Sequence, residues 1–335
     1  MPFSILFIGD PHFRVNNLIE VDLFTKLLYE VVDTHKPSFV CIGGDLLDTH
    51  EQVHITPLNR ATTMINELRK RVPVYVLVGN HDAINNQIFL EDTHWMNALK
   101  NWENVTIVDR VTVLEHDSHT ILFVPYVPNG RFIEALNTVQ TDWKTADCIF
   151  AHQEFKGCKM GAIISETGDE WDEKFPFIVS GHIHSKQTPQ SNIYYSGSSI
   201  QHAFGESEDN TIALFTFENR TRSLLEIPSQ VVCKKIVRKR IDEVDTFVCP
   251  KDTEIVKLSL TGTVNEFKTF KKSEKYRKLT EQGVKISFKG IIEQVPKINR
   301  EDSESNSFDT ILHDLVLGTK NPELIELYEK HIRNG

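Results

Sequence analysis

Five short apolar runs in the first 185 residues constrain the fold more than any other feature of the sequence. The runs are SILFIGD, SFVCIGGD, VPVYVLVGNHD, DCIFAHQ and PFIVSGHIH. Each is rich in Val, Ile and Phe, is too short for a helix, and stops at glycine or at a polar cluster, which is typical of a buried strand. Helix-like segments at 18–34 and 57–71 lie between runs. This alternation predicts an α/β layered fold.

The rest of the chain divides into further modules. Closely spaced strand-like runs at 105–127 and 192–227 predict hairpins in a second sheet, so we expect residues 1–228 to form a β-sandwich flanked by helices (αββα). Residues 229–295 show a strand, helix, strand pattern that predicts a small α+β domain. The polar stretch 296–307 is typical of a linker. Residues 308–335 predict two short amphipathic C-terminal helices.

Composition narrows the class of protein. No run of about 18 apolar residues indicates a membrane span, and the first residues resemble a strand more than a secretion signal. Cys41 and Cys148 lie inside apolar runs, and the five cysteines show no CxxC spacing, which favours an intracellular protein. The net charge is −10, yet residues 229–300 contain 17 Lys and Arg against 9 Asp and Glu. This basic module is suited to a polyanion.

Polar side chains follow each apolar run, where the predicted strand ends. Because ligands gather at the carboxyl ends of strands in α/β sheets, we expect five adjacent ends in one sheet to form a single rim. Carboxylate and imidazole ligands suit two divalent ions such as Mn, Fe or Zn, with Asp45 shared between them. The clusters are Asp10-Pro11-His12, Asp45 with Asp48, Asn80-His81-Asp82, His152, and His182 with His184. Eight other histidines are interpreted as ordinary surface or core residues: His35, His50, His54, His94, His116, His119, His313 and His331.

The ordered motifs GDPH, GGDLLD, GNHD, AHQ and GHIH resemble those of the calcineurin-like metallophosphoesterases. Within that superfamily the chain is most similar to the SbcD/Mre-eleven nucleases, the nuclease subunits of the DNA double-strand-break repair complex. The stretches YYSGSSIQHAFGE at 194–206 and FKGCKMG after His152 also resemble that group, especially its compact viral and phage members.

The resemblance implies a role for each motif residue. One ion would be held by Asp10, His12, Asp45 and His184. The second would be held by Asp45, Asn80, His152 and His182. His81 would be the catalytic histidine, beside the leaving oxygen of the scissile phosphate, while Asp48 and Asp82 would orient histidines or order the turn.

The same resemblance implies a function. We expect a two-metal DNA nuclease, most simply with Mn²⁺, in which a hydroxide bridging the metals attacks the phosphodiester. Residues 229–295 resemble a capping domain that positions DNA, and the C-terminal helices resemble the region that docks on an SbcC-like, SMC-family coiled-coil ATPase. A homodimer is a further expectation. The alternatives are a phosphoesterase acting on phosphoproteins, nucleotides or small diesters, and a non-catalytic scaffold.

Six lysines of the basic module are candidates for DNA phosphate contacts. The alternative interpretation is a solvated helix face. The six are Lys234, Lys235, Lys268, Lys271, Lys272 and Lys275.

Overall fold

The computed structural model describes residues 3–219, 221–248, 254–291 and 308–333. The chain forms two compact units, Met1–Lys289 and Gly290–Gly335. The first contains two large sheets, a small three-stranded sheet and their helices. The described residues 308–333 of the second form helices. The predicted linker 296–307 lies outside the described residues.

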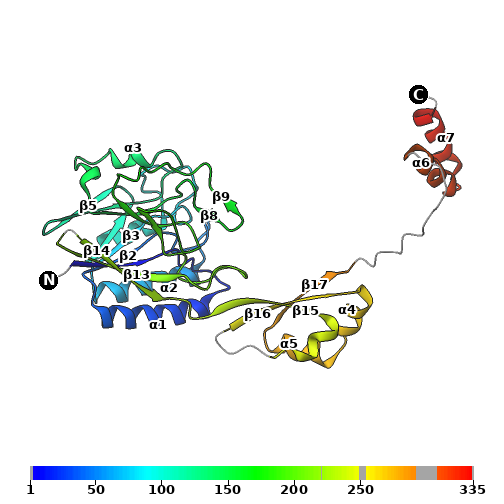
Figure 1. The fold of residues 1–335 in the computed structure, drawn as a ribbon, viewed down its shortest axis with the longest axis horizontal. Helices are drawn as coiled ribbons and strands as arrows, with labels where there is room; N and C mark the ends of the chain where they lie inside the picture. Colours follow the sequence, from blue (N-terminus) through cyan, green and yellow to red (C-terminus); the bar gives the residue numbers. More distant parts are fainter. Residues whose placement is uncertain (1–2, 220, 249–253, 292–307, 334–335) are drawn as a thin grey trace. The chain divides into compact units, whose positions relative to one another are not determined.

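The first large sheet has the order β14-β13-β1-β2-β3-β4. Figure 1 labels β2, β3, β13 and β14 of this sheet. Strands β1 to β4 are parallel, whereas β13 pairs antiparallel with β1 and also with β14. The strands are β1 (Phe3–Ile8), β2 (Phe39–Ile42), β3 (Val74–Leu77), β4 (Val105–Val108), β13 (Thr211–Glu218) and β14 (Thr221–Pro228).

The second large sheet has the order β11-β12-β10-β7-β6-β5. Its central strands β12, β10, β7 and β6 are parallel, and β11 and β5 pair antiparallel at the two edges. The strands are β5 (Thr112–His116), β6 (His119–Val124), β7 (Cys148–His152), β10 (Phe177–Gly181), β11 (Gln187–Gln190) and β12 (Ile193–Tyr195).

The two sheets and their helices build the predicted αββα sandwich, with three apolar layers. Ile5 and Phe7 of β1 face the second sheet, while the alternate residues Leu6 and Ile8 face the helices, as the two-residue period of a strand requires. Helices α1 (Leu18–His35) and α2 (Ile55–Arg69) cover the first sheet. Helix α3 (Phe132–Leu136) covers the second, and the short helices η1 (Trp95–Asn101) and η2 (Trp143–Thr145) fill the two outer layers.

The expectation that all five motif strands share one sheet is wrong. β1, β2 and β3 belong to the first sheet, whereas β7 and β10 belong to the second. The segments expected in the second sheet are also divided, because β4, β13 and β14 join the first. A buried parallel strand has the same apolar composition in either sheet, so the pattern that identifies the strand does not identify its neighbours.

A smaller sheet follows, with the order β15-β16-β17 and two helices. Its core includes Leu258, Leu260, Phe270 and Leu279, which confirms the predicted strand, helix, strand pattern. The elements are β15 (Cys233–Arg240), η3 (Ile241–Thr246), β16 (Glu254–Gly262), α4 (Val264–Phe270), α5 (Glu274–Glu281) and β17 (Lys285–Gly290).

The second unit contains α6 (Phe308–Gly318), α7 (Pro322–Tyr328) and a final π-helical turn, η4 (Glu329–Arg333). These are the two helices expected at the C-terminal end. Across the described ranges, every helix is too short or too polar to cross a lipid bilayer.

Candidate metal centre

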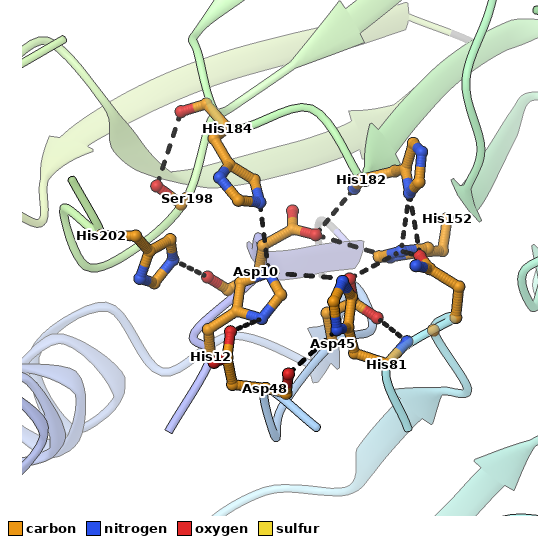
Figure 2. Close-up of polar contacts among 12 residues, drawn as sticks. Asp10, His12, Asp45, Asp48, His81, His152, His182, His184, Ser198 and His202 are labelled. Carbon is orange, nitrogen blue, oxygen red and sulfur yellow. Dashed lines mark hydrogen bonds and ion pairs between the residues drawn. The ribbon is translucent and has the colours of Figure 1, made fainter. Parts of the chain in front are cut away.

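The motif side chains converge although they come from two sheets. Figure 2 shows Asp10, His12, Asp45, His152, His182 and His184 pointing toward one another at the ends of their strands. β1 and β2 deliver the first three, and β7 and β10 deliver the others. The carboxyl-terminal ends of the strands of both sheets therefore meet along one seam, which is the line of contact between the two sheets. The motif side chains gather across that seam.

The backbone at this seam adopts conformations that are costly for residues other than glycine. Asp10, His12, Asp45 and His182 have φ values of 37°, 42°, 48° and 77°. Left-handed conformations of this kind cost of order 1–3 kcal/mol each and are found at functional sites. Here each one turns a polar side chain off the end of its strand and into the site.

Two glycines allow the side chains to approach so closely. A Cβ at Gly44, where φ is 99°, would lie 2.3 Å from His152 Nδ1. A Cβ at Gly79 would lie 2.2 Å from Asp45 Oδ1. Any larger residue at either position would displace an imidazole or a carboxylate of the site.

One cluster contains Asp10, His12 and His184, whose ligand atoms lie within 4.8 Å of one another. The Nε2 atoms of His12 and His184 are 3.2 Å apart. Asp10 Oδ1 accepts a hydrogen bond from the backbone N–H of His182 at 2.8 Å. Its other oxygen, Oδ2, is buried with no hydrogen-bond partner among the described residues.

The second cluster contains Asp45, His152 and His182, within the same 4.8 Å limit. Asn80 completes it, because its Oδ1 lies 3.0 Å from both His152 Nε2 and His182 Nδ1. The backbone carbonyl of Gly43 lies 2.7 Å from His152 Nδ1. The carbonyl therefore holds the proton on Nδ1 and leaves Nε2 facing the cluster.

Asp45 joins the two clusters. Its Oδ2 lies 3.6 Å from His12 Nε2 and 3.3 Å from His152 Nε2. Its Oδ1 accepts a hydrogen bond from the backbone N–H of His81 at 2.8 Å. One carboxylate oxygen therefore faces a ring nitrogen of each cluster, while the other fixes the carboxylate's orientation.

These donors fit a pair of divalent cations. Ring nitrogens of two imidazoles face each other twice in the site, at 3.2 Å between His12 and His184 and at 3.3 Å between His152 and His182. Two neutral imidazoles at such a distance can place at most one proton between the facing nitrogens. The unpartnered Asp10 Oδ2 adds a buried acceptor. A shared cation beside each nitrogen pair satisfies these groups, and the mixture of nitrogen and oxygen donors suits borderline to hard divalent metals.

Burial and neighbouring charge adjust the protonation of the site. Burial raises the pKa of Asp10. Burial would also raise the pKa of Asp45, but the charge and hydrogen bond of His152 outweigh it and lower that pKa. Burial and the neighbouring His152 lower the pKa of His182 to about 3. His182 is therefore a neutral imidazole, the form that binds metal.

His81 lies beside the two clusters. Its Nδ1 lies 3.0 Å from the backbone carbonyl of Asp48, so Nδ1–H donates to that carbonyl, and Nε2 forms no hydrogen bond within the described part of the chain. Its ring packs edge-on against His12 and stacks on His50 with 4.6 Å between ring centres. His12, Asp48 and His81 also form a third close group, but the Asp48 carboxylate already pairs with His12 at 3.3 Å and Arg14 at 3.2 Å.

The expectation that Asp82 orders the turn is confirmed. Its carboxylate accepts hydrogen bonds from the backbone N–H groups of Leu46, Leu47 and Gly79. The indole N–H of Trp95 donates to the same group at 2.9 Å. Burial, with the nearby charge of Asp45, raises the pKa of Asp82 to about 6.

Three residues near the site were not expected there. His202 Nε2–H donates to the backbone carbonyl of Asp10 at 2.9 Å, and its ring packs edge-on against those of His12 and His184. Glu206 Oε1 lies 3.6 Å from His184 Nδ1. His50, interpreted from the sequence as an ordinary histidine, stacks on His81. None of the three follows an apolar run, which was the signal that identified the others.

Comparison with known proteins agrees with this geometry. The sequence profile of the family described as "Calcineurin-like phosphoesterase" matches residues 3–186. The chain belongs to this family. Calcineurin-like phosphoesterases use divalent metals, and the Asp and His clusters described above provide sites for them. The chain is thus a metal-dependent phosphoester hydrolase with an αββα fold.

Viral phosphoesterases are among the similar sequences. "Putative phosphoesterase 244L" of Invertebrate iridescent virus 6 is 49% identical over 281 residues, covering 81% of this chain and 98% of that protein. "Putative phosphoesterase 078R" of Invertebrate iridescent virus 3 is 43% identical over 339 residues, covering 99% of this chain and 97% of the relative. A solved structure titled "GAP50 the anchor in the inner membrane complex of Plasmodium" aligns with a TM-score of 0.42 and 12% identity, over 68% of this chain and 85% of that one.

The two histidines of the GHIH motif belong to different clusters of this phosphoesterase. We therefore expect His182→Ala and His184→Ala each to lower bound metal from two ions to about one per chain. Adding Asn80→Ala to His182→Ala should leave that stoichiometry unchanged, because both side chains serve the same cluster. Adding it to His184→Ala should remove most of the remaining metal. Elemental analysis of the purified variants measures this, and equal losses from both double variants would contradict the assignment.

Proposed function

We propose that this phosphoesterase is a two-metal DNA nuclease, acting as the nuclease subunit of a double-strand-break repair complex of the SbcCD type. The observation that carries the proposal is the pair of clusters joined through Asp45, with His81 beside them. The resemblance of YYSGSSIQHAFGE and of the basic module to SbcD nucleases supports DNA as the substrate.

Different residues would have different roles in hydrolysis. Asp10, His12, Asp45 and His184 would hold one ion and Asp45, Asn80, His152 and His182 the other. When bound, the ions polarise the phosphoryl oxygens and lower the pKa of water. His81 keeps its Nδ1–H on the Asp48 carbonyl, so in its protonated form Nε2–H is available to the leaving sugar oxygen. Asp82 holds the loops that carry Asp45 and Asn80.

The six candidate lysines of the basic module differ in their surroundings. Lys234 is half-buried, pairs with Glu20 at 3.5 Å and reaches the backbone carbonyl of Gln201, so it joins β15 to the sandwich. Lys235 pairs with Glu254, and Lys275 donates to the carbonyl of Phe247. The other three are exposed and form no ion pair within the described part of the chain: Lys268, Lys271 and Lys272.

Those three exposed lysines are the ones we expect to contact phosphate. Replacing Lys268, Lys271 and Lys272 with serine should weaken DNA binding and lower the slope of log affinity against log salt by roughly 2–3, since each duplex phosphate contact contributes about 0.9. Fluorescence anisotropy over a salt series measures the slope. Lys278→Ser is the matched control, because Lys278 already pairs with Glu274 at 2.9 Å. An unchanged slope in the triple variant would assign these lysines to a solvated face.

The second unit supports a partner for the nuclease. Helices α6 and α7 expose Leu315, Leu317, Leu324 and Leu327. Leucine-rich helical faces of this kind pack against other helices. The proposed partner is the coiled coil of an SMC-family ATPase.

The deciding experiment is a cleavage assay on the full chain. Labelled linear duplex, hairpin and single-stranded DNA are incubated with Mn²⁺ or Mg²⁺, with and without EDTA, beside a phosphopeptide, a nucleoside monophosphate and bis(p-nitrophenyl) phosphate. We expect metal-dependent DNA cleavage that His81→Ala lowers by about 10²-fold or more. Hydrolysis of the phosphopeptide or nucleotide without DNA cleavage would replace the proposal with the corresponding phosphoesterase activity.

A further inference from the structure

A cavity of about 610 Å³ lies directly beside the metal centre. One wall is His182 to Ser185, which includes a histidine of each cluster. A second wall is the segment from Phe204 to Ser207. The third is Lys159 to Gly161. These residues are the first strand and the turn of a small hairpin of β8 (Lys159–Met160) and β9 (Ile163–Ile164). Whatever flanks a phosphate held at the metal centre on this side must occupy this cavity.

The base of the hairpin is firmly held. Cys158 is fully buried, and backbone hydrogen bonds join Gly157 to Ser165 and Ser165 to Cys158 at 2.8 Å. Gln187 of β11 pairs with the backbone of Lys159 twice, accepting from its N–H at 2.7 Å and donating to its carbonyl at 2.9 Å. The hairpin is therefore fixed to the same segment that carries His184.

The tip of the hairpin is apolar and exposed. Met160, Ile163 and Ile164 are 40%, 66% and 57% exposed. Met160 lies directly opposite Ile163, so the two side chains share one face of the hairpin. These three apolar side chains are exposed and contribute little to a core. Met160 lines the cavity, and Ile163 and Ile164 lie next to it on the paired strand. Exposed apolar groups at such a place indicate a contact made with a ligand.

We propose that the β8–β9 hairpin is a wedge that inserts Met160, Ile163 and Ile164 among the bases of DNA and unstacks the end next to the scissile phosphate. Isoleucine and methionine are among the side chains that proteins insert between base steps for this purpose. The inference rests on the proposed DNA substrate. It adds that the strand which reaches the metal centre is a frayed or single-stranded end of a duplex.

The charges around the cavity are compatible with a polyanion. Its one carboxylate, Glu206, accepts from the backbone N–H of His202 at 2.6 Å and pairs with His184 at 3.6 Å. Lys159 lines the hairpin side, and Lys285 lies 5.4 Å from the ring centre of Phe204 on the opposite side. Aromatic rings such as Phe204 are common stacking surfaces for unpaired bases.

The test compares cleavage of a blunt duplex with cleavage of the same sequence whose terminal bases are mismatched and splayed. For Ile163→Asn/Ile164→Asn we expect about tenfold or greater loss on the blunt duplex, since unstacking a step costs a few kcal/mol, and a smaller loss on the splayed duplex. Ile163→Leu/Ile164→Leu should restore the wild-type ratio. Leu224→Asn/Leu225→Asn, at exposed apolar positions of β14, should match the wild type on both.

A second readout needs no catalysis. With 2-aminopurine as the terminal base and EDTA present, binding of the wild type should increase its fluorescence, and binding of Ile163→Asn/Ile164→Asn should not. Equal losses on blunt and splayed DNA, or an unchanged fluorescence increase in that variant, would overturn the wedge. A wild type that hydrolyses bis(p-nitrophenyl) phosphate but no DNA would instead overturn the proposed function, and the wedge with it.

Discussion

Asp45→Asn should remove metal from both clusters and lower hydrolysis of bis(p-nitrophenyl) phosphate by roughly 10³-fold or more, because one lost stabilising group at the reacting centre already costs 10²–10³. The reason is that Asp45 Oδ2 faces a ring nitrogen of each cluster, at 3.6 Å from His12 Nε2 and 3.3 Å from His152 Nε2. Elemental analysis and steady-state kinetics on the same preparation measure both effects.

Asp109→Asn is the control for altering a buried carboxylate. Asp109 pairs with Lys100 and His94 away from the metal centre, so its variant should retain both ions and wild-type kinetics even if it melts at a lower temperature. An Asp45→Asn variant that kept two ions and most of its activity would show that the clusters do not share this residue.

His81→Ala should lower cleavage by about 10²–10⁴-fold, the usual contribution of a positioned proton donor, while both ions remain bound. The residue lies beside the clusters, with Nδ1 held by the Asp48 carbonyl at 3.0 Å and Nε2 without a hydrogen bond to any described residue. The loss should be smaller for a substrate with a p-nitrophenolate leaving group, since that group leaves without a proton. DNA and bis(p-nitrophenyl) phosphate assayed in parallel measure this difference.

His116→Ala is a suitable control, because His116 is partly exposed and contacts Phe3 within the sandwich. A His81→Ala variant that lost its metal would mean that His81 binds an ion. Equal losses on the two substrates would argue against a proton transfer from His81 to the leaving oxygen.

The strands and their polar ends could be predicted because each depends on local sequence. Asp10, Asp45 and His152 directly follow apolar runs, and the structure brings them together with the expected neighbours. The assignment of strands to sheets could not be predicted in the same way. β3 and β7 are both short buried parallel strands, but only the packing of whole layers places them in different sheets.

His202 and Glu206 illustrate a second limit of prediction from the sequence. They lie in a loop after β12, where no periodic pattern marks them. Hydrogen bonds from Ser199 to the carbonyl of Gly9 hold this loop beside the end of β1. Lys234 illustrates the reverse case. The sequence presents it as one more cation of a basic strand, whereas its contacts with Glu20 and Gln201 give it a structural role.

The position of β1 inside the first sheet has a consequence for synthesis of the protein on the ribosome. β1 pairs with β2 on one edge and with β13, which ends at Glu218, on the other. His12 likewise meets His184, 172 residues later. Until β13 has emerged from the ribosome, the nascent chain has an unpaired strand edge, which favours aggregation. Until His184 has emerged, the hydrolytic site is incomplete. A chain that ends before His182 lacks one histidine of each cluster, so we expect it to hydrolyse no phosphoester.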